Sequence, residues 1–177
     1  MGESVITIVA IFLAAVLMFV FPLVSVSERN DDISQLAVQS ATSEFTDDIR
    51  TTGTITQAKY DAFLTTLSAT GNSYDVELEA KILDENPGKK GTNLTQANKI
   101  GENIYYSVYT SQILDALAAN NGKYTLKEGD IINVTVKNTN RTIAELLRSF
   151  FYRVTGDTTY EIAASQSGMI MSTGKWE

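Results

Sequence analysis

Three acidic residues alternate along one stretch of the chain and are the first candidates for chemistry. Asp75, Glu77 and Glu79 are two residues apart, a spacing that places their carboxylates on one face of a β-strand. Two carboxylates that flank a cleft can hydrolyse a glycosidic bond. Apolar residues alternate with these acids, however, and that pattern is typical of the solvated face of a sheet. We therefore expect the three carboxylates to face solvent and to have no catalytic role.

The composition excludes several other kinds of site. The 177 residues include neither cysteine nor histidine, which excludes disulfides, thiolate metal sites and nucleophiles activated by histidine. The net charge of -7 provides no basic surface for nucleic acid. Residues 84–86 lack the alternating ligands of a calcium loop, and residues 88–92 (GKKGT) lack the first glycine of a phosphate-binding loop. We expect no catalytic residue, metal, cofactor, nucleic acid or small-molecule substrate, and predict that the protein is not an enzyme.

Aromatic residues gather in two places along the chain. At their spacings about half of the side chains must face the core of the protein. The others would suit a contact between neighbouring subunits. The residues are Tyr105, Tyr106, Tyr109, Phe150, Phe151 and Tyr152.

The elements that would position these residues begin with a long apolar run. Residues 5–26 carry no charge, and only Thr7, Pro22 and Ser25 interrupt the apolar side chains. As a helix the run would be about 33 Å long, enough to cross a bilayer. A cleaved signal peptide is expected to have a basic start and a shorter apolar core, although the small residues at 25–27 are spaced like a cleavage site. We favour retention of the run as an anchor, and its removal as a signal peptide is the alternative.

The pattern after the run predicts that the helix continues. Apolar and small side chains recur every three or four residues, and most acidic and amide side chains fall off that stripe. No Gly or Pro interrupts the pattern between Pro22 and Gly53. We predict one helix over residues 4–50, bent locally at Pro22. Its second half is expected to pack on a globular body through Ile33, Leu36, Ala37, Ser40, Ala41, Phe45 and Ile49.

This N-terminal arrangement resembles the type IV pilin-like family. The resemblance rests on an uncharged stem, an acidic residue close to its start (Glu3), Pro22 near the end of the apolar half, and an amphipathic continuation into a small head. The tight-adherence (Tad) branch, with its TadE-like pseudopilins, is the most similar. The resemblance covers the stem, and the rest of the chain in general layout only.

The resemblance implies a bacterial surface filament whose core is formed by the stems of many copies. It also implies that Glu3 pairs with the α-amino group of a neighbouring copy. A tolerated charge outside the bilayer is the other interpretation of Glu3. The sequence departs from the family because only Met1 and Gly2 precede Glu3. We therefore expect either a degenerate leader or no processing.

The remainder of the chain predicts short helices and strands. Helices are expected at 54–68, capped by Thr54 or Thr56, near 113–119, and at 143–154 after a capping box that begins at Thr142. Strands are expected at 74–83, 104–109, 131–137 and 160–170, although one continuous helix over residues 93–122 is an alternative. The predicted class is α+β, with a long N-terminal helix packed on a small, mainly antiparallel sheet. Residues 1–52 would form the stem and amphipathic helix, and residues 53–177 the globular head.

These features together predict a structural subunit of an extracellular pilus-like filament. The excess of acids after the apolar run favours an exported head. The chain would sit in the cytoplasmic (inner) membrane before assembly and then in an adhesive filament built from copies of itself. The alternative is a single-pass anchored, pseudopilin-like component of a secretion or conjugation complex. The residues expected to carry assembly are Glu3, Val5, Ile8, Phe12, Val16, Phe19 and Pro22.

Overall fold

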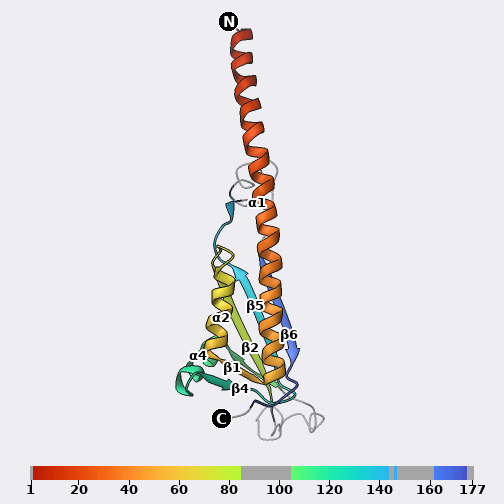
Figure 1. The fold of residues 1–177 in the computed structure, drawn as a ribbon, viewed down its shortest axis with the longest axis vertical. Helices are drawn as coiled ribbons and strands as arrows, with labels where there is room; N and C mark the ends of the chain where they lie inside the picture. The colour runs from red at the N-terminus through yellow and green to blue at the C-terminus, as the bar shows by residue number, and fades with distance from the viewer. Residues whose placement is uncertain (1, 85–104, 144–145, 147–161, 175–177) are drawn as a thin grey trace, which may run out of the picture.

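The chain forms a long helix with a small mixed head at one end. A computed structural model describes residues 2–84, 105–143, 146 and 162–174. Its elements in order are α1 (Gly2–Thr52), β1 (Thr54–Thr56), α2 (Gln57–Ser68), β2 (Tyr74–Leu83), β3 (Tyr105–Tyr109), α4 (Thr110–Ala119), β4 (Lys123–Thr125), β5 (Ile131–Asn138) and β6 (Ala163–Met169). The predicted α+β class is confirmed, because the long helix lies on antiparallel strands accompanied by short helices (Figure 1).

Helix α1 has two halves with different surroundings. Its 51 residues correspond to a length of about 77 Å. Residues 2–26, called the stem below, project for most of their length beyond the rest of the chain, whereas residues 27–52, the head half, lie along the sheet (Figure 1). The predicted helix over residues 4–50 is confirmed. It continues without interruption through Pro22, and the local bend there stays a prediction.

The head is built on a four-stranded antiparallel sheet with the strand order β3-β2-β5-β6. Ala80 of β2 lies opposite Ile132 of β5, and Val136 of β5 lies opposite Ala164 of β6. The predicted alternation in β2 is confirmed, because apolar side chains such as Leu78 are buried while Asp75 is exposed. Alternation therefore gives the sheet one apolar face for the helices and one polar face.

Helices cover the apolar face of the sheet and close the core. The head half of α1 packs against β5, β6 and α2, while α4 packs against β2, β3 and β4. The ring of Phe45 in α1 stacks on that of Phe63 in α2, with 4.4 Å between the ring centroids. Val38 and Ile49 of α1 are fully buried in the same core. The head half of α1 is therefore a structural part of the head.

Two polar side chains of α1 fasten the edge strand β6 along the helix. The Gln35 amide exchanges two hydrogen bonds with the backbone of Ala163, donating to its oxygen (2.6 Å) and accepting from its nitrogen (3.0 Å). At the other end of β6, Nε of Arg50 donates to the oxygen of Met169 (3.2 Å). The helix rises about 22 Å between these side chains and the strand advances about 20 Å, so α1 and β6 run side by side in the same direction.

The predicted packing face of the head half is wrong in its first two turns. Ile33 and Leu36 are 59% and 66% exposed, and Ala37 and Ser40 are exposed as well. The later part of the predicted face is correct. The residues of α1 that are buried against the head are Asp31, Ser34, Val38, Ala41, Thr42, Phe45, Thr46 and Ile49.

The buried face of α1 combines apolar side chains with Ser and Thr, and α1 packs along β6. The inward positions of β6 include Ala164 and Gly168, and a Cβ added at Gly168 would collide with the side chain of Arg50. The hydroxyls of Thr42 and Thr46 donate to helix carbonyls one turn earlier, each over 2.7 Å. Their hydrogen bonds are thereby satisfied inside the core.

The smaller elements agree with most of the sequence expectations. Thr56 caps α2 by accepting from the nitrogen of Lys59 (3.3 Å). Thr54 instead belongs to β1, which pairs with β4 in a two-stranded sheet that the sequence did not predict. Helix α4 ends where Asn121 and Gly122 adopt positive φ angles of 52° and 75°. The alternative of one continuous helix over residues 93–122 is wrong at residues 105–109, which form β3, whereas α4 is helical as that alternative expected.

Some expectations fall on residues outside the described ranges. They include residues 93–104 of the alternative helix and the aromatic residues 150–152. Of the helix predicted at 143–154, only Ile143 and Leu146 are described, and both are helical. The last strand is confirmed over residues 163–169.

Candidate assembly surface

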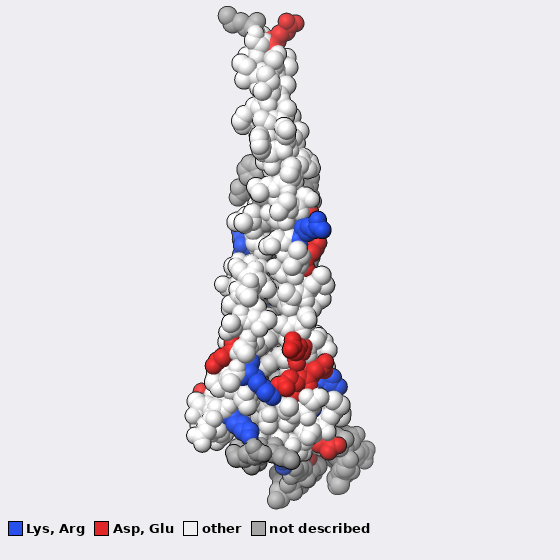
Figure 2. Space-filling view, viewed as in Figure 1, with Lys and Arg blue, Asp and Glu red and all other residues white. Residues whose placement is uncertain are grey.

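The stem presents large apolar side chains on all sides. No residue in its most apolar window of 18 residues is buried, and Phe12 and Phe19 are 69% and 74% exposed. Figure 2 shows this region without charge except at its tip, while the acidic and basic side chains lie over the head. All hydrogen bonds of a helix backbone are internal, so such a segment suits an apolar environment of lipid or protein.

The predicted assembly residues do not share one face of the stem. A helix turns about 100° per residue, which places Ile8, Phe12, Phe19 and Pro22 together on one side. Val5 and Val16 flank that side, and Val16 is partly buried. Glu3 projects from roughly the opposite side. The stem therefore offers two distinct directions for contact.

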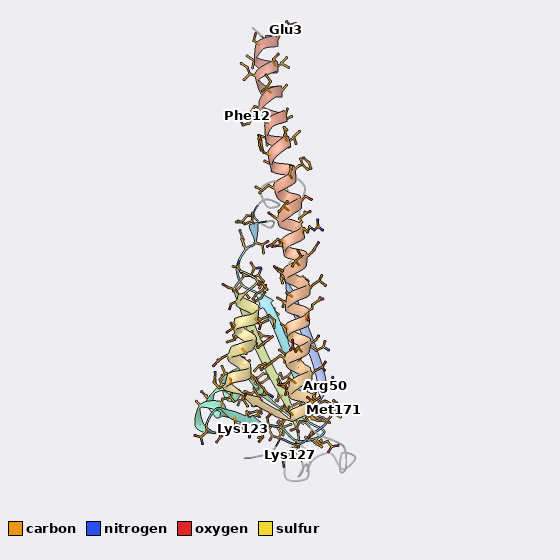
Figure 3. All side chains as sticks on the ribbon, viewed as in Figure 1. Glu3, Phe12, Arg50, Lys123, Lys127 and Met171 are labelled. Atoms are coloured by element: carbon orange, nitrogen blue, oxygen red, sulfur yellow. The ribbon has the colours of Figure 1, made fainter. Side chains whose placement is uncertain are left out.

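Glu3 lies at the free tip of the helix (Figure 3). Its backbone oxygen accepts a hydrogen bond from the Thr7 hydroxyl (2.9 Å), and within the described residues its carboxylate pairs with no cation. A carboxylate in the first turn interacts favourably with the helix dipole. The same position leaves the charge accessible to another molecule.

Ile33 and Leu36 extend the apolar surface of the stem into the head half. By the same rotation of about 100° per residue, Ile33 falls on the side of α1 that carries Ile8, Phe12 and Phe19, whereas Leu36 falls about 80–120° away from them, closer to Pro22. Both side chains point away from the head, because the buried face of α1 is on the opposite side. Sequence analysis assigned them to the core. The signal that could have placed them correctly is the drift of the stripe around the helix between residues 33 and 49.

The carboxylates with the best spacing for chemistry lie on the polar face of the sheet. Asp75 and Glu77 are exposed, and Glu79 accepts a hydrogen bond from the Ser107 hydroxyl (2.7 Å) across the strand pair. Within the described ranges, no group of three or more acidic residues is placed to hold a metal ion. Tyr106 and Tyr109 are exposed on β3, the edge strand on the opposite side of the sheet from β6.

Comparison with known proteins does not extend these observations. No protein-family model, no curated protein and no solved structure matches the chain. The resemblance to type IV pilin-like proteins therefore stays a prediction. By length and composition, α1 can cross a membrane, and a signal sequence near the N-terminus would meet the same criteria. The chain thus carries an apolar N-terminal helix suited to membrane insertion or to export.

Proposed function

We propose that the protein is a structural subunit of an extracellular filament, assembled through the stems of many copies. The observation that carries the proposal is the combination of a fully exposed apolar stem with exposed apolar residues farther along the same helix. The role proposed is mechanical and not catalytic. Before assembly, the stem would hold the chain in the membrane.

Energetics require that something covers the stem. Burying one Phe or Ile side chain away from water stabilises by about 1.5–3 kcal/mol. The stem carries many such side chains, so water is excluded as its working environment. Lipid and the stems of other copies are both apolar, and transfer between them has a small driving force that depends on close packing.

Ile33 and Leu36 favour a filament over a single anchored copy. They follow Val26 by about 10 Å and about 15 Å along the helix. The headgroup region of a bilayer is only about 6 Å deep on each side of the hydrocarbon. A membrane around residues 5–26 would therefore leave Leu36 in water, whereas a parallel α1 from a neighbouring copy would cover it.

The position of Glu3 is compatible with more than one neighbour. It projects from the side opposite Ile8, Phe12 and Phe19, so one copy could pack on the apolar side while another meets the carboxylate. In an apolar surrounding an unpaired carboxylate is strongly disfavoured. Pairing with the α-amino group of a neighbour would stabilise the charge and set the offset between copies.

The experiment compares two double variants in cells that make the protein. Ile33→Ser/Leu36→Ser removes the exposed apolar pair beside the stem. Met169→Ser/Met171→Ser removes a similarly exposed pair at the far end of the head. Cells are sheared, and the released high-molecular-weight fraction and the membrane fraction are both assayed for the chain.

We expect the unmodified chain and the Met variant in the sheared fraction, and the Ile33/Leu36 variant mainly in the membrane. Glu3→Ala should likewise reduce assembly and leave insertion intact. A chain that never appears in the sheared fraction would support an anchored, pseudopilin-like monomer. Normal assembly of the Ile33/Leu36 variant would disprove the role of that pair.

A further inference from the structure

A short turn of the head, described at residues 141–143 and at Leu146, is fastened to α1 at the foot of the stem. The Thr142 hydroxyl donates to Oδ2 of Asp31 (2.7 Å), and both residues are buried. The nitrogen of Leu146 donates to the oxygen of Thr142 (3.0 Å), which closes one helical turn. The turn lies beside α1, beyond the end of the sheet (Figure 1). Its position relative to α1 is therefore fixed by the chain itself.

The turn lies level with the last apolar residues of the stem. A hollow of about 500 Å³ is lined by Leu23 and Val26 of α1 together with Asn72, Asn140 and Ile143 of the head. Val26 is the last residue of a run about as long as the hydrocarbon core is thick. Whenever the stem spans a bilayer, Ile143 must therefore lie at the boundary between acyl chains and headgroups.

The side chains of this turn suit that boundary. Ile143 is 64% exposed and Leu146 is 50% exposed, although both belong to the face that the sequence pattern assigns to the interior. Arg141 is exposed beside them, and Asn72 and Asn140 join through a hydrogen bond of 3.2 Å. Apolar side chains next to a cation and neutral amides are typical of protein surfaces that rest on lipid.

We propose that residues 141–143 and Leu146 form a second membrane contact, which seats the head on the bilayer surface. Ile143 and Leu146 enter the headgroup–acyl boundary, and Arg141 lies at the level of the lipid phosphates. The inference rests on the membrane-inserted stage of the proposed function. Lipid is favoured over a second copy because the insertion of the stem by itself brings the turn to the boundary.

A consequence follows for the orientation of the head. A stem alone would leave the head free to rotate and tilt about the helix axis. A second contact to one side of the stem selects one face of the head to lie against the membrane. Departure from the bilayer then requires withdrawal of the turn together with the stem.

The test uses the absence of cysteine from the chain. Three single-cysteine variants, Phe12→Cys, Ile143→Cys and Met171→Cys, are made in the full chain and labelled with an environment-sensitive fluorophore. All three positions are exposed, so the substitutions leave the core intact. Phe12 and Met171 lie near opposite ends of the molecule (Figure 3). The labelled chains are reconstituted into phosphatidylcholine–phosphatidylglycerol vesicles, with brominated lipid or aqueous iodide as quencher.

We expect brominated lipid to quench the labels at positions 12 and 143, and iodide to quench only the label at 171. If lipid quenches position 12 while iodide quenches position 143 as strongly as 171, the stem is inserted and the second contact is disproved. If neither quencher reaches position 143, protein covers the turn and the inference is overturned in favour of a second copy. Loss of lipid quenching at position 12 would disprove the membrane-inserted stage itself.

Discussion

The two halves of α1 belong to one helix, but only the head half buries a face, which combines apolar and hydroxyl-bearing side chains. The head half places small and hydroxyl-bearing residues such as Ser34, Thr42 and Thr46 against the sheet and leaves Ile33 and Leu36 exposed. The stem leaves its large apolar residues exposed throughout. The head half is complete within one chain, whereas the stem depends on molecules outside it.

This contrast shows that hydrophobicity alone does not identify the packing face of a helix. A Cβ added at Gly168 of β6 would collide with the Arg50 side chain, and the buried hydroxyls of Thr42 and Thr46 bond to the helix itself. Large apolar residues are then available for the outer side. In a chain that assembles, the outer side is the one that must attract partners.

The largest effect should come from comparing one isoleucine in each half. Ile49 is fully buried and Ile8 is exposed. Ile49→Ala should lower the free energy of unfolding of the head by about 2–5 kcal/mol, through lost transfer energy and a cavity. Ile8→Ala should change it by less than about 0.5 kcal/mol. Urea unfolding in detergent, followed by near-ultraviolet circular dichroism, measures both, and equal effects would contradict the division of α1.

The junction between α1 and the sheet provides the next comparison. Gly53 has a φ angle of 62°, and a Cβ there would collide with the backbone of Ser172 and Gly174. Gly71 has a φ angle of 81° with nothing within 4 Å of an added Cβ. Gly53→Ala should destabilise the head by about 3 kcal/mol through strain and overlap together, and Gly71→Ala by about 1 kcal/mol through strain alone.

Thermal unfolding of the two glycine variants distinguishes these contributions. We expect Gly53→Ala to have the lower midpoint temperature of unfolding. Similar unfolding temperatures would mean that the carbonyl of Ser172 moves aside. Residues 172–174 would then not be held against the C-terminal end of α1.

Asp31 marks the boundary between the two halves of α1. Asp31→Ala removes the acceptor of the buried Thr142 hydroxyl and should weaken the turn by about 1–2 kcal/mol, while Asp31→Asn keeps an acceptor and should weaken it less. The amide of Leu146, which donates to Thr142, reports this directly by hydrogen exchange. Faster exchange in the Ala variant, with unchanged protection of β5, is expected. Unchanged exchange of Leu146 would show that other contacts hold the turn.

The smallest expected effect is a loss of folding stability of the head at alkaline pH. Burial, followed by the charges of Asp75 and Asp61, raises the pKa of Tyr60 above its ordinary value of 10.0. Because the folded-state pKa is the higher one, the neutral phenol contributes stability that is complete below pH 10. That contribution is lost as the pH rises through the folded-state pKa. Tyr60→Phe should make unfolding midpoints less sensitive to pH above 10, whereas an unchanged pH dependence would exclude Tyr60 as the cause.

The elements with strong local signals could be predicted from the sequence. Alternation of apolar and acidic residues identified β2, and Asn121 and Gly122 correctly marked the end of α4. β1 and β4 could not be predicted, because each is three residues long and forms only when distant parts of the chain meet. Pairing of this kind depends on tertiary contacts more than on local propensity.

The stem and the continuation of its helix were predicted, but the packing face of the first two turns of that continuation was not. A run without charge is recognised by composition alone, so residues 5–26 needed no knowledge of their surroundings. The exposure of Ile33 and Leu36 depends on which face of α1 packs on β6, a strand that lies more than a hundred positions later in the sequence. The hydrogen bond from Thr142 to Asp31 likewise joins distant parts of the chain. No local sequence pattern predicts it.

Crosslinking from Phe12 tests whether the stem is covered by the stems of other copies. p-Benzoylphenylalanine is placed at position 12 and irradiated in living cells that make the protein, and the sheared fraction is analysed under denaturing conditions. The account predicts covalent multiples of the chain's own mass in that fraction. Adducts to lipid alone, with the chain remaining monomeric in the membrane, would contradict it.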